Sequence, residues 1–114
     1  MASSLNFTNT KGDTFDAVAF QLKINGVNAN LTGATIKMQL KERYCLANAV
    51  LSLTSVASAG ITITNAAAGQ FKINEQIIDI PVRNYVYDIQ ITFSDATVKT
   101  YVKGNFNITE EVTV

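Results

Sequence analysis

The stretch NLTGATIKMQL, residues 30–40, decides the fold class of this chain. From residue 34 onward, apolar and polar residues alternate without a break. A period of two places the two sets on opposite faces of a β-strand. We therefore predict a strand over residues 34–41, and none of the side chains on its polar face looks reactive. The face expected in the core carries Ala34, Ile36, Met38 and Leu40, and the polar face carries Thr35, Lys37 and Gln39.

The same alternation recurs along the chain, most clearly over residues 84–93, where Tyr85 and Tyr87 begin the inward face. Turn signals separate such segments about every 8 to 12 residues, and no helical segment is long enough for a βαβ unit. The pattern predicts an all-β, antiparallel two-sheet sandwich of about seven to eight strands. Further strands are expected at residues 14–24, with Val18, Phe20, Leu22 and Ile24 on one face, and at residues 49–55, 61–64, 71–73, 98–103 and 105–112.

The connections between these strands carry local signals of their own. Asn25-Gly26 is the strongest short turn signal, but residues 27–33 after it favour a loop over a tight hairpin. Residues 42–48 fit either a loop or one helical turn. Residues 75–80 predict one helical turn that stops at Pro81, the single proline.

Length and composition narrow the class of protein. The chain has 114 residues, which suits one domain. Nine basic and nine acidic residues give a net charge of zero. Nucleic acid and anionic membranes need a concentrated basic face, so neither is expected as the main partner. The charged fraction of 16% is below the typical value of about 25%. This low charged fraction is compatible with a surface that neighbouring proteins cover, and equally with the ordinary variation in composition among small domains.

The N-terminal sequence adds two expectations. Residues 1–15 lack the basic and apolar regions of a secretory signal, and no apolar run approaches the ~20 residues that span a bilayer. Synthesis in the cytoplasm is therefore expected. Residues 1–10 are expected to form a flexible arm that orders on binding, ahead of one domain over residues 11–114.

No catalytic, cofactor-binding or metal site is predicted. A nucleophile needs a base beside it, and the chain has no histidine, so Cys45 is interpreted as a structural thiol. The absence of histidine, together with a single cysteine, also excludes a tetrahedral zinc site of the usual ligands. No DxDxDG-like loop or phosphate-binding motif is present, which leaves Gly12 and Gly33 without such a role. The carboxylates show no marked glycosidase pair, and the three that could ligate calcium, Asp13, Asp16 and Asp88, are interpreted as solvated. The full set is Asp13, Asp16, Glu42, Glu75, Asp79, Asp88, Asp95, Glu110 and Glu111.

Two strand positions have specific expectations. Asp88 lies mid-strand, where aspartate is disfavoured, and is expected to face outward beside Lys99 or Lys103 of the neighbouring strand. One of Tyr85 and Tyr87 is expected to tie back to the preceding loop through its hydroxyl. The alternative use of these tyrosines is an exposed aromatic patch together with Tyr44 and Tyr101. The Asn-x-Thr triplets at Asn6, Asn30 and Asn107 are interpreted as turn and strand residues.

Three segments carry a family resemblance. They are KGDTFDAVAFQLKINGVNANLTGATIKMQLKE (residues 11–42), ITITNAAAGQFKI (61–73) and YVYDIQITFSDATVKTYVKGNFNITEEVT (85–113). Their order of Gly-Asp-Thr, Leu-Thr-Gly-Ala-Thr, Tyr-x-Tyr-Asp and a Gly-x-Phe-x-Ile closing strand resembles small immunoglobulin-like domains of bacteriophage particles. The chain departs from that pattern at Asn84, where a glycine is common, and at residues 42–53, which replace a shorter loop.

The resemblance implies an immunoglobulin-like β-sandwich similar to the N-terminal domains of phage baseplate upper proteins and to related tail- or head-associated proteins. It implies a non-enzymatic virion structural protein, acting as a tail or baseplate adaptor or as capsid decoration. Its expected partners are other tail, baseplate or capsid proteins, or further copies of itself, with no cofactor, nucleic acid or membrane. The expected location is the virion, after synthesis in the host bacterial cytoplasm. The alternative is a virion-borne module that binds carbohydrate or a cell surface.

Overall fold

The computed structural model describes residues 3–24, 26–43 and 48–110, and throughout these ranges the protein is all-β, as predicted. Its one non-strand element there is a short 3-10 helix, η1 (Val56–Ser58). The described part of the chain is divided into more strands than the seven to eight expected. They are β1 (Ser3–Ser4), β2 (Phe7–Thr10), β3 (Thr14–Phe15), β4 (Val18–Gln21), β5 (Lys23–Ile24), β6 (Val27–Asn28), β7 (Thr35–Lys41), β8 (Leu51–Thr54), β9 (Ile61–Asn65), β10 (Gln70–Ile73), β11 (Gln76–Ile77), β12 (Arg83–Thr92) and β13 (Val98–Thr109).

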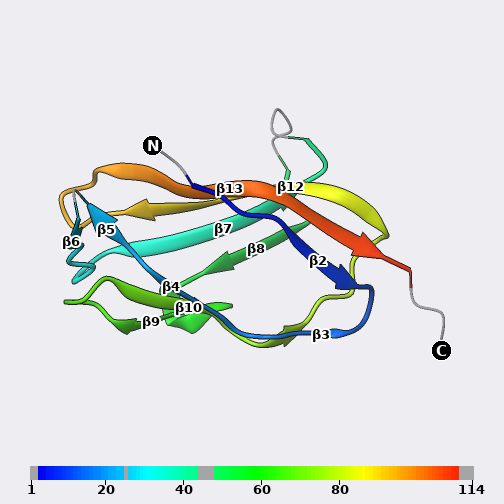
Figure 1. Ribbon diagram of the computed structural model, residues 1–114, viewed down its shortest axis with the longest axis horizontal. Helices are drawn as coiled ribbons and strands as arrows, with labels where there is room; N and C mark the ends of the chain where they lie inside the picture. The colour runs from blue at the N-terminus through cyan, green and yellow to red at the C-terminus, as the bar shows by residue number, and fades with distance from the viewer. Residues whose placement is uncertain (1–2, 25, 44–47, 111–114) are drawn as a thin grey trace.

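The larger sheet is built around β12, which pairs antiparallel with β13 on one side and with β7 on the other (Figure 1). β8 extends it beyond β7, and β1 and β2 both pair with β13 at the opposite edge. β13 is one continuous strand over Val98–Thr109, where the sequence predicted two strands. The register of its ladder with β12 shifts after Ile89: Ile89 lies opposite Val102, whereas Gln90 lies opposite Thr100. Tyr101 is therefore the extra residue of a β-bulge, a feature that re-aims a side chain.

The N-terminal residues form part of this sheet. β1 and β2 run parallel to β13, with Ser3 opposite Val102 and Phe7 opposite Phe106. The sequence predicts a flexible arm over residues 1–10 that orders on binding, and in this structure residues 3–4 and 7–10 pair with β13. A short strand at a sheet edge takes its stability from a distant partner, which a local sequence pattern does not reveal.

A second layer holds the three-stranded sheet β4-β10-β9 and the short ladder of β3 with β11 (Figure 1). β11 occupies part of residues 75–80, where one helical turn was predicted; its backbone pairs with β3 instead. The tight hairpin disfavoured by the sequence also forms, because Ile24 of β5 pairs with Val27 of β6. Gly26 has φ +77° in that turn, a conformation that glycine adopts without penalty.

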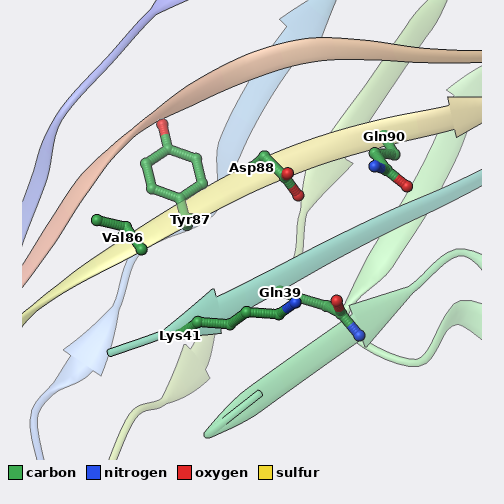
Figure 2. Close-up of a pocket in the computed structure, with 6 residues that line it drawn as sticks. All are labelled: Gln39, Lys41, Val86, Tyr87, Asp88 and Gln90. Carbon is green, nitrogen blue, oxygen red and sulfur yellow. The ribbon is translucent and has the colours of Figure 1, made fainter. Parts of the chain in front are cut away.

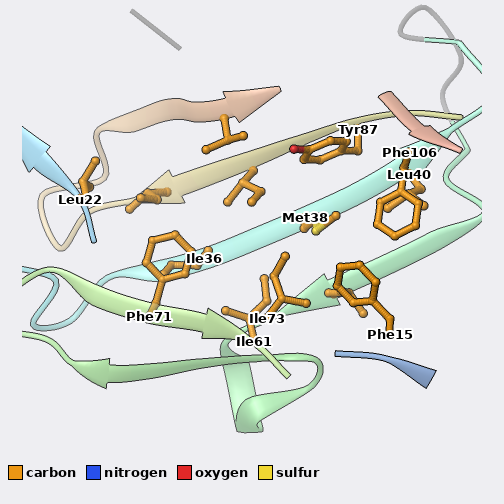
Figure 3. Close-up of a cluster of buried hydrophobic side chains, with 14 of the residues drawn as sticks. Phe15, Leu22, Ile36, Met38, Leu40, Ile61, Phe71, Ile73, Tyr87 and Phe106 are labelled. Carbon is orange, nitrogen blue, oxygen red and sulfur yellow. The ribbon is translucent and has the colours of Figure 1, made fainter. Parts of the chain in front are cut away.

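The core lies between the two layers, which makes the fold β-sandwich-like (Figure 3). Ile36, Met38 and Leu40 of β7 are at most 1% exposed, as the opening alternation predicted. Leu22 is buried as expected, but Ile24 is 49% exposed because the chain has by then entered the β5–β6 hairpin. No helix within the described ranges is long and apolar enough to cross a membrane. Across the core, the other layer contributes Phe15, Ile61, Phe71 and Ile73, and β12 contributes Tyr85, Tyr87, Ile89 and Ile91.

Candidate interaction surfaces

The outward face of the larger sheet carries polar side chains from β7 and β12. A small hollow of about 80 Å³ opens between these two strands and is lined by Gln39, Lys41, Val86, Tyr87, Asp88 and Gln90 (Figure 2). Two amides, one ammonium and one carboxylate can donate and accept hydrogen bonds there. Ligand pockets usually enclose about 300 to 1,000 Å³, so this hollow suits contact with a polar protein surface better than enclosure of a substrate.

Asp88 has the cross-strand neighbour that was predicted for it. Lys103 of β13 lies directly opposite, and Gln39 of β7 is its partner on the other side. Lys99, the other candidate, lies opposite Ile91 instead. A lysine opposite an aspartate in an antiparallel pair is a favourable arrangement.

Three tyrosine hydroxyls donate to backbone carbonyls. Tyr85 bonds to the Pro81 carbonyl at 2.6 Å, which confirms the predicted tie to the preceding loop. Tyr87 bonds to the Leu5 carbonyl at 2.6 Å, and Tyr101 bonds to the Gln21 carbonyl at 2.9 Å. Burial raises the pKa of Tyr85 and of Tyr101, because it disfavours the phenolate, and the negative charge of Glu42 adds to the effect at Tyr85.

These contacts bear on the predicted aromatic patch. Tyr85 and Tyr87 are each 1% exposed and present no ring face to a ligand. Tyr101 is partly buried, and its ring packs edge-on against Phe71 at 6.2 Å. The fourth tyrosine, Tyr44, and the predicted structural thiol of Cys45 lie outside the described residues.

The edge of β13 forms a groove that the N-terminal segment fills. The ring of Phe7 lies 5.5 Å from each of the rings of Phe15, Tyr87 and Phe106, measured between centroids. The Leu5 amide donates to the Lys103 carbonyl at 3.1 Å. This surface, formed by the β13 edge and its aromatic pocket, is called the β13 groove below. It binds an extended strand through backbone hydrogen bonds and one aromatic anchor.

Gly104 makes the close approach in this groove possible. A Cβ atom at this position would overlap the carbonyl oxygen of Leu5 and would lie 2.8 Å from the side-chain oxygen of Asn6. That same Asn6 oxygen accepts the Asn105 amide at 3.0 Å. The sequence reasoning missed this contact, although a glycine inside a strand pattern is a recognised signal for close approach of another backbone.

The carboxylates do not assemble into a site. Within the described ranges, no group of three or more His, Cys, Asp or Glu side chains is placed to hold a metal ion. Asp79 pairs with Lys11 at 2.7 Å on the surface. Asp95 accepts the Thr97 amide at 2.9 Å, and hydrogen bonds from Thr97 lower the pKa of this carboxyl. Asp13, Asp16, Glu42, Glu75 and Glu110 are exposed, and Glu111 lies outside the described residues.

The remaining residues singled out from the sequence have turn and strand roles. Asn30 accepts the Thr32 amide at 3.0 Å, which closes an Asx turn. Asn107 lies within β13, and Asn6 lies between β1 and β2. Gly12 and Gly33 have φ values of +82° and +76°, so both serve backbone turns.

Comparison with models of known protein families found no match, and no curated protein sequence matches the chain.

Proposed function

We propose that this chain is a non-enzymatic structural protein of a bacteriophage particle, built as an immunoglobulin-like sandwich and working through contacts with other proteins. In this proposal it serves as a tail or baseplate adaptor or as capsid decoration. Its partners are neighbouring virion proteins and further copies of itself.

The strand order supports the immunoglobulin-like part of the proposal. One layer follows the order β13-β12-β7-β8 and the other β4-β10-β9, while the first strands run parallel to the last. The Tyr85 hydroxyl bonded to the Pro81 carbonyl matches the tyrosine corner, in which a tyrosine near the start of the second-last strand bonds back to the chain just before it.

The observation that carries the proposal is where the resemblance motifs lie in the fold. Gly33 of Leu-Thr-Gly-Ala-Thr precedes β7 with a positive φ, and a Cβ there would lie 3.1 Å from Cβ of Ser94. Tyr85 of Tyr-x-Tyr-Asp forms the corner, and Gly104 of Gly-x-Phe-x-Ile faces Leu5. These three motifs therefore serve the scaffold. A likeness confined to such positions favours a shared scaffold whose outer surfaces carry the function.

The polar sheet face is the surface best suited to those contacts. Gln39, Lys41, Asp88 and Gln90 line a shallow hollow there, flat enough for a protein neighbour. In a symmetric particle many copies bind together, so weak individual contacts suffice. The alternative, a carbohydrate-binding module with stacking tyrosines, is not favoured because Tyr85 and Tyr87 are buried.

Mass spectrometry of purified particles tests the proposal. Particles produced by the phage genome that encodes this chain are expected to contain its peptides in a fixed ratio to the major capsid or tube protein. Peptides found in the infected-cell lysate but missing from purified particles would refute the virion assignment. Particles made with Gln39→Glu and Gln90→Glu should contain less of the protein, because added carboxylates disturb the polar face without touching the core.

A further inference from the structure

We propose that the β13 groove exchanges its occupant between molecules, so that the N-terminal strand of one copy fills the groove of a second copy. The product is a reciprocal dimer in which each chain donates residues 3–10 and receives the same segment. The inference concerns the chain itself, so it can fail in purified protein while the virion assignment stands.

The N-terminal strand is held almost entirely by the groove. Its backbone runs beside β13 (Figure 1). The Leu5 carbonyl accepts the Tyr87 hydroxyl, and Phe7 fills the aromatic pocket. All of these contacts form equally well with an identical strand from a second chain. Residues 3–10 of a second copy therefore fit the groove as well as the chain's own residues 3–10 do.

The connection between β2 and β3 decides how easily the strand leaves. The Lys11 amide donates to the Thr109 carbonyl and moves with the strand, whereas the Gly12 amide donates to the Ile78 carbonyl and stays with the body. Gly12 has φ +82°, and glycine adopts positive and negative φ at similar cost. The turn can thus straighten at this residue without backbone strain.

The contacts that span that hinge are weak. The Asp13 amide donates to the Thr10 carbonyl at 3.0 Å, and the Asn9 side chain donates to the Asp13 carbonyl at 3.3 Å. A third contact is the surface ion pair of Lys11 with Asp79, and exposed pairs contribute little. The closed and exchanged forms therefore differ mainly in these contacts and in the entropy of association.

An empty groove is the least favourable state. It would leave the edge of β13 unpaired and would remove the acceptor of the Tyr87 hydroxyl from a residue that is 1% exposed. The groove must then be filled from within the chain or by a neighbour. High local concentration favours the neighbour by mass action.

Cysteine cross-linking between two differently labelled chains tests the exchange directly. Thr8 and Asn107 are Cα partners next to the inward pair Phe7 and Phe106, so their side chains point outward together. Thr8→Cys is made in one chain and Asn107→Cys in another, and both chains carry Cys45→Ser. One of the two chains is isotope-labelled. The two proteins are mixed and oxidised, and the masses of the cross-linked products are measured by mass spectrometry. The control mixture replaces Thr8→Cys by Ser52→Cys, on the opposite edge strand β8.

The expected result is a mixed covalent dimer at least about tenfold above the control mixture, since linkage through Thr8 and Asn107 in separate chains requires exchange. The double variant Thr8→Cys/Asn107→Cys in one chain verifies the geometry, with a short bifunctional thiol reagent where a disulfide does not close. Efficient linkage within that double variant, with mixed dimer no higher than the control, would overturn the proposal.

A hinge variant gives an independent readout. Gly12→Pro fixes φ near −65°, which the closed turn does not permit, and it removes the amide bonded to Ile78. Light scattering should then show a shift from monomer toward dimer at equal concentration. Gly26→Pro is the control, because it forces the same change at a residue with φ +77° in the β5–β6 turn. This variant should leave the molar mass measured by light scattering unchanged. A folded Gly12→Pro protein that stays monomeric at millimolar concentration would count against exchange.

Discussion

Replacing Gly104 with alanine should detach the N-terminal strand. The new Cβ would overlap the Leu5 carbonyl oxygen, which is backbone and cannot rotate away as a flexible side chain could. Either the pairing of β1 and β2 with β13 shifts, or the N-terminal strand detaches from β13. Three hydrogen bonds are then at risk: Tyr87 to Leu5, Leu5 to Lys103 and Asn105 to Asn6. At about 1 kcal/mol each, the expected loss is about 3 kcal/mol in the free energy of unfolding.

Equilibrium unfolding in urea measures this loss, with far-UV circular dichroism as the signal. Gly26→Ala is the matched control, because Gly26 has φ +77° but a Cβ added there would meet no atom within 4 Å. Its cost is backbone strain alone, about 1 kcal/mol. Gly104 does not have a positive φ, so the cost of its replacement is steric. Equal destabilisation by the two variants would refute the reasoning.

A double-mutant cycle with Tyr87→Phe sharpens the test. Tyr87→Phe alone removes the hydroxyl that donates to Leu5 and should cost about 1 kcal/mol. Once Gly104→Ala has displaced Leu5, the hydroxyl has already lost that acceptor. The double variant should therefore be about 1 kcal/mol more stable than the two single losses predict. Simple additivity would mean that Gly104 acts elsewhere than on Leu5.

Four further predictions concern separate parts of the fold. Tyr85→Phe should cost about 1 kcal/mol in denaturant unfolding, because the Pro81 carbonyl loses its partner. The pKa values of Tyr85 and Tyr101 are raised in the folded state, so the folded state holds these phenol protons more tightly than the unfolded chain does. The free energy of unfolding should therefore be unchanged below pH 10 and should fall as the pH rises above it. A free energy of unfolding that stays constant from about pH 9 to 11 would contradict this. Ala96 has φ +71°, so Ala96→Gly should raise the thermal midpoint or leave it unchanged, and a clear drop would show that the turn is not strained. Lys103→Glu places like charges opposite Asp88 and should destabilise by up to about 1 kcal/mol, an effect that high salt should reduce if it is electrostatic.

The local pattern was sufficient for strands that have one face in the core. Ile36, Met38 and Leu40 are buried as their spacing predicted, and the register places Lys103 opposite Asp88. The Tyr85 corner was predictable because it depends on a position near the start of a strand. In each case the information lies within a single strand and its adjoining loop or hairpin partner.

The features that the sequence did not reveal depend on distant partners. The sequence of residues 3–10 shows no clear strand pattern of its own. Its strand conformation is stabilised by β13, about a hundred positions later in the chain. Residues 75–80 have a helical composition, yet β3 supplies backbone partners that favour a strand. The β13 groove, which the N-terminal strand fills, is built from such long-range contacts.

The pairing of Phe7 with Phe106 has a consequence for the order of folding. During synthesis β2 is made well before β13, so the rings of Phe7, Phe15 and Tyr87 cannot close around Phe106 until β13 has left the ribosome. Contacts of such sequence separation are slow to form because loop closure must come first. The ladder of β2 with β13 therefore forms only after the other described strands have been made.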